Sequence, residues 1–187
     1  MYCVFLIYLV ANFYKSHERL IMSSIIYFSY GSNMSTPRLV QRIPSARFVS
    51  VASLRGHKLK FHKRGHDRSA KCDIEFTDRA SDFVYGIVFK YLASEKPNLD
   101  LIEGLGNGYN EKVVTVMSLS GREYQSVTYF ATDIDKSLKP FHWYKEHVVR
   151  GAVEHGLPVD YIRTIESIVS VPDPDQINHQ RELAIYN

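Results

Sequence analysis

The sequence is poor in the residues and motifs that usually support metal or covalent chemistry. Only two of its 187 residues are cysteines, Cys3 and Cys72, so we expect no disulfide framework and a reducing compartment. It has no Cys-x-x-Cys pair, no Gly-x-Ser-x-Gly motif and no Gly-x-x-x-x-Gly-Lys phosphate loop. These absences argue against structural zinc, an α/β-hydrolase serine nucleophile and nucleotide hydrolysis.

An excess of charge of one sign is also lacking. The 23 basic and 20 acidic residues give a net charge of only +3, which is too balanced to indicate nucleic acid as the main partner. Most of the local excess lies in residues 55–68, and no aromatic stacking motif accompanies it. We interpret this segment as a solvated hairpin rim and expect no nucleic-acid partner.

The apolar run at residues 2–14 is too short to cross a membrane. As a helix it would extend about 20 Å, against a hydrocarbon core of about 30 Å. Charged residues follow the run instead of preceding it, unlike a secretory signal. We expect no stable membrane insertion and a cytoplasmic location. Three interpretations of residues 1–24 stay open: a packed extension, a weak membrane anchor, or upstream sequence read from a wrong start codon, with Met22 as the true start.

Hydrophobic periodicity predicts strands over the first two thirds of the chain and helices at its end. A β-rich run at 25–30 ends in a tight turn. The other strands are predicted as a hairpin of 47–54 with 58–62, single strands at 72–76 and 83–90, and a second hairpin of 112–119 with 124–130. Helices are predicted at 37–42, 95–105, 140–155 and 159–167.

This order of elements has no alternating strand–helix rhythm. It predicts an α+β fold in a single domain, with a mixed barrel-like β-sheet of about six or seven strands and flanking and C-terminal helices. We expect this domain to occupy residues 25–170, after an N-terminal extension at 1–24 and before a C-terminal surface tail at 171–187.

The histidines do not form a metal-binding pattern. His57, His62 and His66 precede Cys72, but their spacing does not match a zinc finger. Because side chains alternate along a strand, His57 and His62 would face opposite sides. We therefore expect these three histidines at the surface, Cys72 buried in a strand, and no metal site.

The sharpest local feature is the turn Tyr30-Gly31-Ser32-Asn33-Met34 after the first strand. A glycine, a small hydroxyl and an asparagine between a strand and a helix can direct several backbone N–H groups toward one point. Such an arrangement binds a carboxylate or a developing oxyanion. The alternative is an ordinary turn.

This turn also carries a resemblance to a known family. Residues 28–34 (FSYGSNM) resemble the YGSN signature of the γ-glutamylcyclotransferase family, and the likeness extends over most of residues 25–168. Four further segments match in the family's order: 44–46 (PSA), 84–89 (VYGIVF), 99–104 (LDLIEG) and 154–161 (EHGLPVDY).

The resemblance implies an enzyme that cyclises a γ-glutamyl group to 5-oxoproline and releases the attached amine, without a cofactor. The family's catalytic carboxylate falls on Glu103. The residues that match substrate-binding positions are Tyr30, Gly31, Ser32, Asn33, Met34, Tyr109, Tyr129 and Tyr144.

The helix pattern itself adds to this assignment. Glu103 lies one turn after Leu99, at the border of an apolar stripe formed with Ile102 and Leu105, whereas Asp100 points outward. A border position partly shields a carboxylate from water, which suits a proton acceptor.

Several alternatives remain at this stage. The substrate is a γ-glutamyl amino acid, a γ-glutamylamine on a lysine side chain, or a γ-glutamylated biosynthetic intermediate. The glutathione-specific branch carries YGSL, so Asn33 counts against it. An alternative from another functional class is a non-catalytic sensor on the same fold. The presence of Glu103 argues against it, because a binding role would not require the carboxylate. The expected partner is a small-molecule γ-glutamyl substrate, and a homodimer is left open.

Overall fold

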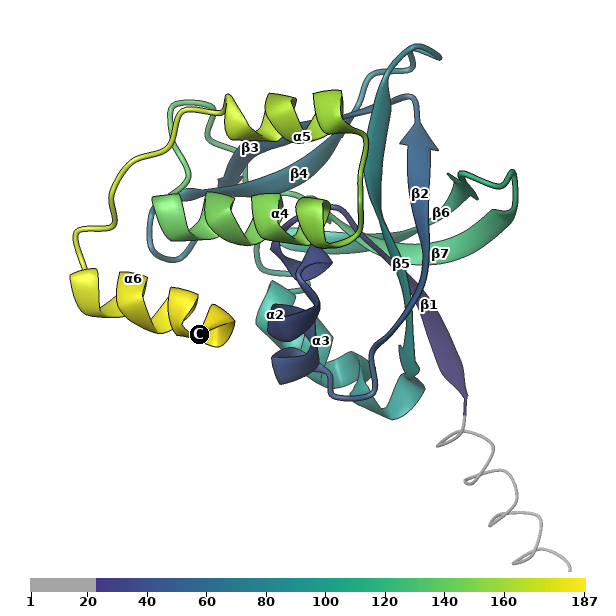
Figure 1. The fold of residues 1–187 in the computed structure, drawn as a ribbon, viewed down its shortest axis with the longest axis horizontal. Helices are drawn as coiled ribbons and strands as arrows, with labels where there is room; N and C mark the ends of the chain where they lie inside the picture. Colours follow the sequence, from purple (N-terminus) through teal and green to yellow (C-terminus); the bar gives the residue numbers. More distant parts are fainter. Residues whose placement is uncertain (1–22) are drawn as a thin grey trace, which may run out of the picture.

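The computed structural model describes residues 23–187, so the interpretations of residues 1–24 fall almost wholly outside it (Figure 1). The strands are β1 Ser24–Ser29, β2 Arg47–Arg55, β3 His57–Arg64, β4 Ala70–Phe76, β5 Phe83–Leu92, β6 Tyr109–Ser118 and β7 Glu123–Ala131. The helices are α2 Thr36–Arg42, α3 Lys96–Glu103, α4 His142–Glu154, α5 Val159–Glu166 and α6 Gln176–Leu183, with short 3₁₀ turns η1 Ser32–Met34, η2 Ala93–Glu95 and η3 Ala184–Tyr186. Among residues 23–187, no helix has the length and apolarity needed to span a membrane.

Five strands close into a barrel in the order β1-β5-β2-β6-β7. The pairs along this order are antiparallel, and the parallel pairing of β1 with β7, at Tyr27 opposite Val127, closes it. Helices α4 and α5 lie on one side of the barrel, and α2 and α3 lie near one end (Figure 1). The predicted α+β fold with a mixed barrel-like sheet is confirmed, as is the hairpin of β6 with β7.

The predicted hairpin of β2 with β3 is wrong. β2 pairs with β5 and β6 in the barrel, whereas β3 pairs with β4 in a separate two-stranded sheet. Between them Gly56 takes a left-handed φ of 73°, and its N–H donates to the carbonyl of Asp82. Alternation identifies each strand, but the partner is chosen by which faces can be buried together.

The histidines predicted at the surface are partly buried. His66 is exposed, but His57 and His62 are 8% and 4% exposed, because a register shift in β3 next to His62 breaks the expected alternation. His62 Nε2 lies 2.8 Å from Asp73 Oδ2, and the other oxygen of Asp73 accepts from the N–H of Ala131 at 2.7 Å. This pair ties the β3–β4 sheet to β7. Within residues 23–187 no three His, Cys, Asp or Glu side chains gather to hold a metal.

Helix α4 packs closely against the turn that follows β1. A Cβ atom added to Gly151 would lie 2.4 Å from the backbone nitrogen of Ser35 and 2.5 Å from the carbonyl carbon of Met34. Three residues further along α4, Glu154 accepts a hydrogen bond from the N–H of Thr36 at 3.1 Å. The missing side chain of Gly151 therefore allows α4 to hold the turn in place.

Gly151→Ala tests this close approach. We expect a net loss of about 1–2 kcal/mol in the free energy of unfolding, because overpacking costs about 1–3 kcal/mol and better helix propensity returns up to about 1 kcal/mol. Urea unfolding gives the measurement. Val153→Ala, at a position on α4 that is 57% exposed, is the control. Equal stability of the two variants would contradict the packing role of Gly151.

The C-terminal segment forms α6 and η3, which make partly buried polar contacts with the rest of the domain. Glu182 of α6 accepts from Arg38 of α2 at 2.5 Å. The hydroxyl of Tyr186 lies 2.7 Å from Nδ1 of His147 and donates to Ser35 Oγ at 2.9 Å. Figure 1 shows the C-terminus beside α2. The last residues of the chain thereby connect to α2 and α4, the helices next to the turn after β1.

His147 makes the fold sensitive to pH. Burial lowers the pKa of its imidazole from 6.5 to about 4; Glu182 opposes this shift and the charge of Arg38 adds to it. Between these two pH values the unfolded chain binds a proton that the folded chain does not. This contribution to stability is therefore complete above pH 6.5 and is lost as the pH falls toward 4.

We expect the wild type to lose about 2 kcal/mol more stability than His147→Gln between pH 7 and pH 5. The glutamine keeps a donor and an acceptor but does not titrate. Urea unfolding at both pH values gives the comparison, with His142→Gln as the control because His142 lies at an exposed position of the same helix. Parallel pH profiles of wild type and His147→Gln would refute the assignment.

Candidate active site

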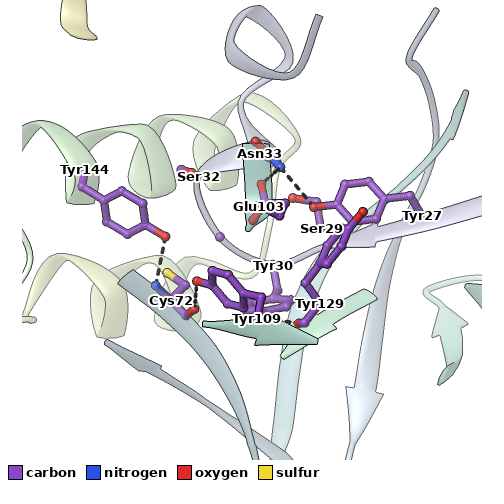
Figure 2. Close-up of a pocket in the computed structure, with 11 residues that line it drawn as sticks. Tyr27, Ser29, Tyr30, Ser32, Asn33, Cys72, Glu103, Tyr109, Tyr129 and Tyr144 are labelled. Atoms are coloured by element: carbon purple, nitrogen blue, oxygen red, sulfur yellow. Dashed lines mark hydrogen bonds between the residues drawn. The ribbon is translucent and has the colours of Figure 1, made fainter. Parts of the chain in front are cut away.

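A cavity lies where the turn after β1 meets the ends of α3 and α4 and strands β4, β6 and β7 (Figure 2). Its volume is about 30 Å³. We call it the inner cavity, and its lining residues are Tyr27, Ser29, Tyr30, Gly31, Ser32, Asn33, Cys72, Glu103, Tyr109, Tyr129 and Tyr144. All residues predicted for the site from the sequence are in this set except Met34, which is fully buried beneath α4.

The turn after β1 is tightly constrained. It forms the 3₁₀ turn η1, in which the N–H of Met34 donates to the carbonyl of Gly31 at 3.0 Å. A Cβ atom on Gly31 would lie 3.0 Å from the Cβ of Cys72, so the backbone approaches β4 closely. The first N–H groups of a 3₁₀ turn have no partner within it, which suits this backbone to an anionic group.

Glu103 is held at the cavity by two side chains from the N-terminal part of the domain. Its Oε1 accepts from Nδ2 of Asn33 at 2.8 Å and from Nη1 of Arg42 at 3.0 Å. Arg42 also donates to Oδ1 of Asn33 at 2.8 Å, so the three side chains form a closed triangle. The second oxygen of Glu103 makes no hydrogen bond to any residue in 23–187. Figure 2 shows Asn33 and Glu103 facing each other at one wall.

The predicted apolar stripe on α3 is wrong. Leu99 is fully buried, but Ile102 and Leu105 are 41% and 37% exposed. Glu103 is instead the last residue of α3, because Gly104 takes a left-handed φ of 73° and ends the helix. Its side chain is 15% exposed. The contacts across the cavity, and not a hydrophobic face of its own helix, determine where it points.

Asp100 also differs from its predicted outward position. It accepts from the hydroxyl of Tyr129 at 2.6 Å and from Lys96 at 2.5 Å. The contact with Tyr129 connects α3 to β7. Asp100 therefore fixes a wall of the cavity without lining it.

The predicted tyrosines form a rigid, neutral wall. Tyr109 donates to the carbonyl of Cys72 at 2.5 Å, and the N–H of Cys72 donates to the hydroxyl of Tyr144 at 2.9 Å. Tyr30 donates to the carbonyl of Tyr129 at 2.7 Å. Burial raises the pKa of all four tyrosine hydroxyls well above the ordinary value, so they stay protonated.

Sequence reasoning did not assign Tyr27, Ser29, Cys72 or Arg42 to the site. Tyr27 and Ser29 alternate along β1 on one face, a signal that could have found them. Cys72 was correctly predicted as buried, and burial raises the pKa of its thiol to about 12, which makes it unsuited to act as a nucleophile. No local pattern indicates Arg42, because its partner Glu103 lies 61 positions away.

The chain is similar to known proteins in both sequence and fold. Residues 83–165 match the AIG2-like family. The chain is 36% identical over 152 residues to the gamma-glutamylcyclotransferase of Bos taurus and 34% identical over 149 residues to that of Homo sapiens; each alignment covers 78% of this chain and 79% of the relative. A solved structure titled gamma-glutamyl cyclotransferase has a TM-score of 0.74 at 32% identity, covering 80% of this chain and 90% of that one. The chain belongs to the γ-glutamylcyclotransferase family.

Proposed function

We propose that this protein cyclises the γ-glutamyl group of a small molecule to 5-oxoproline, with Glu103 as the residue that transfers the proton. The main support is the geometry of one carboxylate. Asn33 and Arg42 hold one oxygen of Glu103, and the other oxygen is free to bind a proton at the inner cavity. This arrangement suits a general base.

The reaction is an intramolecular displacement. The α-amine of the γ-glutamyl group attacks its own γ-carbonyl carbon, a new C–N bond closes the five-membered lactam, and the original C–N bond to the second amine breaks. Nucleophile and electrophile belong to one molecule, so much of the entropic barrier is absent. The enzyme therefore needs no nucleophile of its own, and the balance of the reaction requires no cofactor.

Two proton movements accompany these bond changes. An ammonium group is not nucleophilic, so the free oxygen of Glu103 first removes a proton from the substrate's α-ammonium. The same carboxyl group then protonates the departing amine. Asn33 and Arg42 keep the carboxylate in one orientation during both steps, because each contacts Oε1 directly.

The remaining lining residues bind and orient the substrate in this proposal. Backbone N–H groups at residues 30–33 hold either the substrate carboxylate or the oxyanion of the tetrahedral intermediate. Tyr109, Tyr129 and Tyr144 shape the cavity, since their hydroxyls are engaged with the protein and their rings are fixed. A non-catalytic sensor would not require a carboxylate held in this way.

The cellular setting also belongs to the proposal. Low cysteine content supports a cytoplasmic location, and the balanced charge supports a small-molecule partner over nucleic acid. The homodimer stays a prediction, and mass measurement of the native protein in solution would decide it.

Glu103→Gln tests the catalytic assignment. Glutamine keeps an oxygen acceptor for Asn33 and Arg42 but cannot take up the proton, so we expect the folded variant to lose turnover by at least about 100-fold. Loss of the charge that pairs with Arg42 should also lower its thermal stability. Release of 5-oxoproline from γ-glutamyl-alanine gives the rate. The control is Glu111→Gln, a change of the same chemistry at an exposed glutamate on β6. Retention of wild-type turnover by Glu103→Gln would remove Glu103 from the mechanism.

A further inference from the structure

A second pocket adjoins the inner cavity and shares Ser32, Glu103, Tyr109 and Tyr144 with it. We call it the outer pocket. Its volume is about 120 Å³, against about 30 Å³ for the inner cavity. Its other lining residues are Arg38, Arg42, Lys63, Gly65, His66, Lys71, Ile102 and Trp143.

The outer pocket has four basic side chains from three parts of the chain. Three of them are each paired with one carboxylate: Arg38 with Glu182 at 2.5 Å, Arg42 with Glu103 at 3.0 Å, and Lys71 with Asp67 at 2.6 Å. Lys63 makes no ion pair or side-chain hydrogen bond within the described part of the chain. The pocket therefore has one cation whose charge no protein carboxylate balances by direct contact.

Lys63 is also unusually buried for an unpaired lysine. The residue is 5% exposed, and its Nζ lies 4.7 Å from the centre of the Tyr109 ring. Gly108 leaves room for it, since an added Cβ there would lie 2.9 Å from Nζ. Burial lowers the pKa of this ammonium group, and the charge of Glu103 partly offsets that effect. Most of the side chain is therefore buried while the ammonium group faces the outer pocket without a carboxylate partner, which makes it a candidate contact for an anion that enters the pocket.

The two pockets meet at Glu103 and Tyr109, which line both. A substrate that occupies the inner cavity and extends past these two residues enters the pocket that Lys63 lines. The departing nitrogen receives its proton from Glu103 in the proposed reaction. A leaving group that extends from this nitrogen into the outer pocket lies in the pocket that Lys63 lines.

We propose that Lys63 is a specificity-determining residue that binds the carboxylate of the leaving amino acid, so that the enzyme prefers γ-glutamyl α-amino acids to γ-glutamylamines. This inference rests on the proposed function. An α-amino acid carries its carboxylate one carbon away from the departing nitrogen, within reach of a cation beside Tyr109. A simple amine has no group to pair with Lys63 and leaves its charge uncompensated.

Two substrates that differ only in this carboxylate test the proposal. We expect the wild type to favour γ-glutamyl-alanine over γ-glutamyl-ethylamide in kcat/KM by at least about 10-fold, since a charge-assisted contact is removed. Lys63→Met should lower kcat/KM for the alanine compound by about 10- to 100-fold, mainly through KM, and change that for the ethylamide by less than about twofold. Lys63→Arg should restore part of the preference.

Lys60→Met is the matched control, because Lys60 is on the same strand and its amine lies 3.6 Å from Glu75, outside both pockets. It should leave both rates unchanged. An equal loss on both substrates in Lys63→Met would show that Lys63 acts through Glu103 and would overturn the proposal. Equal kcat/KM of the wild type for the two substrates would also overturn the proposal. That result does not depend on whether the variant folds. If the wild type turned over neither compound nor any other γ-glutamyl substrate, the proposed function itself would fail.

Discussion

The site depends on the contact between the side chain of Asn33 and the carboxylate of Glu103. The two residues are 70 positions apart, and their hydrogen bond joins the turn after β1 to the end of α3. Arg42 bonds to both, so the amide, the guanidinium and the carboxylate fix one another. A short polar side chain in a tight turn and a carboxylate at a helix end thereby become parts of one rigid unit. One oxygen remains available for chemistry.

Close backbone packing maintains this contact. Gly31 allows the turn to approach Cys72 on β4, and Gly151 allows α4 to press against the backbone of Ser35. A Cβ atom at Gly151 would overlap the backbone of the turn, and one at Gly31 would press on Cys72, so a side chain at either glycine would disturb the turn that carries Asn33. Backbone packing therefore helps to set the position of Asn33 relative to Glu103, on which the proposed proton transfer depends.

The arginine side chains around the site are paired one to one with carboxylates. Each arginine near the turn has one carboxylate partner, and one of these partners, Glu182, comes from the C-terminal helix α6. Pairing limits the destabilisation that buried charge would otherwise cause. Lys63 departs from this pattern, because no carboxylate among residues 23–187 contacts it and it lines the outer pocket beside Glu103. The proposed contact with a substrate carboxylate would supply the missing partner.

Local sequence patterns predicted the elements whose structure depends on residues close together in the chain. The β-branched run ending in Gly31 predicted a strand and turn, and the alternation around Gly121 predicted the β6–β7 hairpin, because adjacent strands joined by a short turn pair with each other. The same reasoning failed for β2 and β3, whose short connection at Gly56 leads out of the barrel instead of back along it. It also failed for His62, since a register shift cannot be read from residue alternation.

By itself, the sequence determined the class of fold and the turn at residues 30–34, and through resemblance it predicted Glu103 and the tyrosines around it as site residues. Only the tertiary structure decided that Arg42 completes the contact with Glu103, that Asp100 faces inward to Tyr129, and that Lys63 contacts no carboxylate among residues 23–187. The physical reason is that hydrogen bonds and ion pairs between distant elements depend on how a barrel closes and which helices press on it. These contacts depend on the packing of the whole domain, so they cannot be predicted from any short stretch of the sequence.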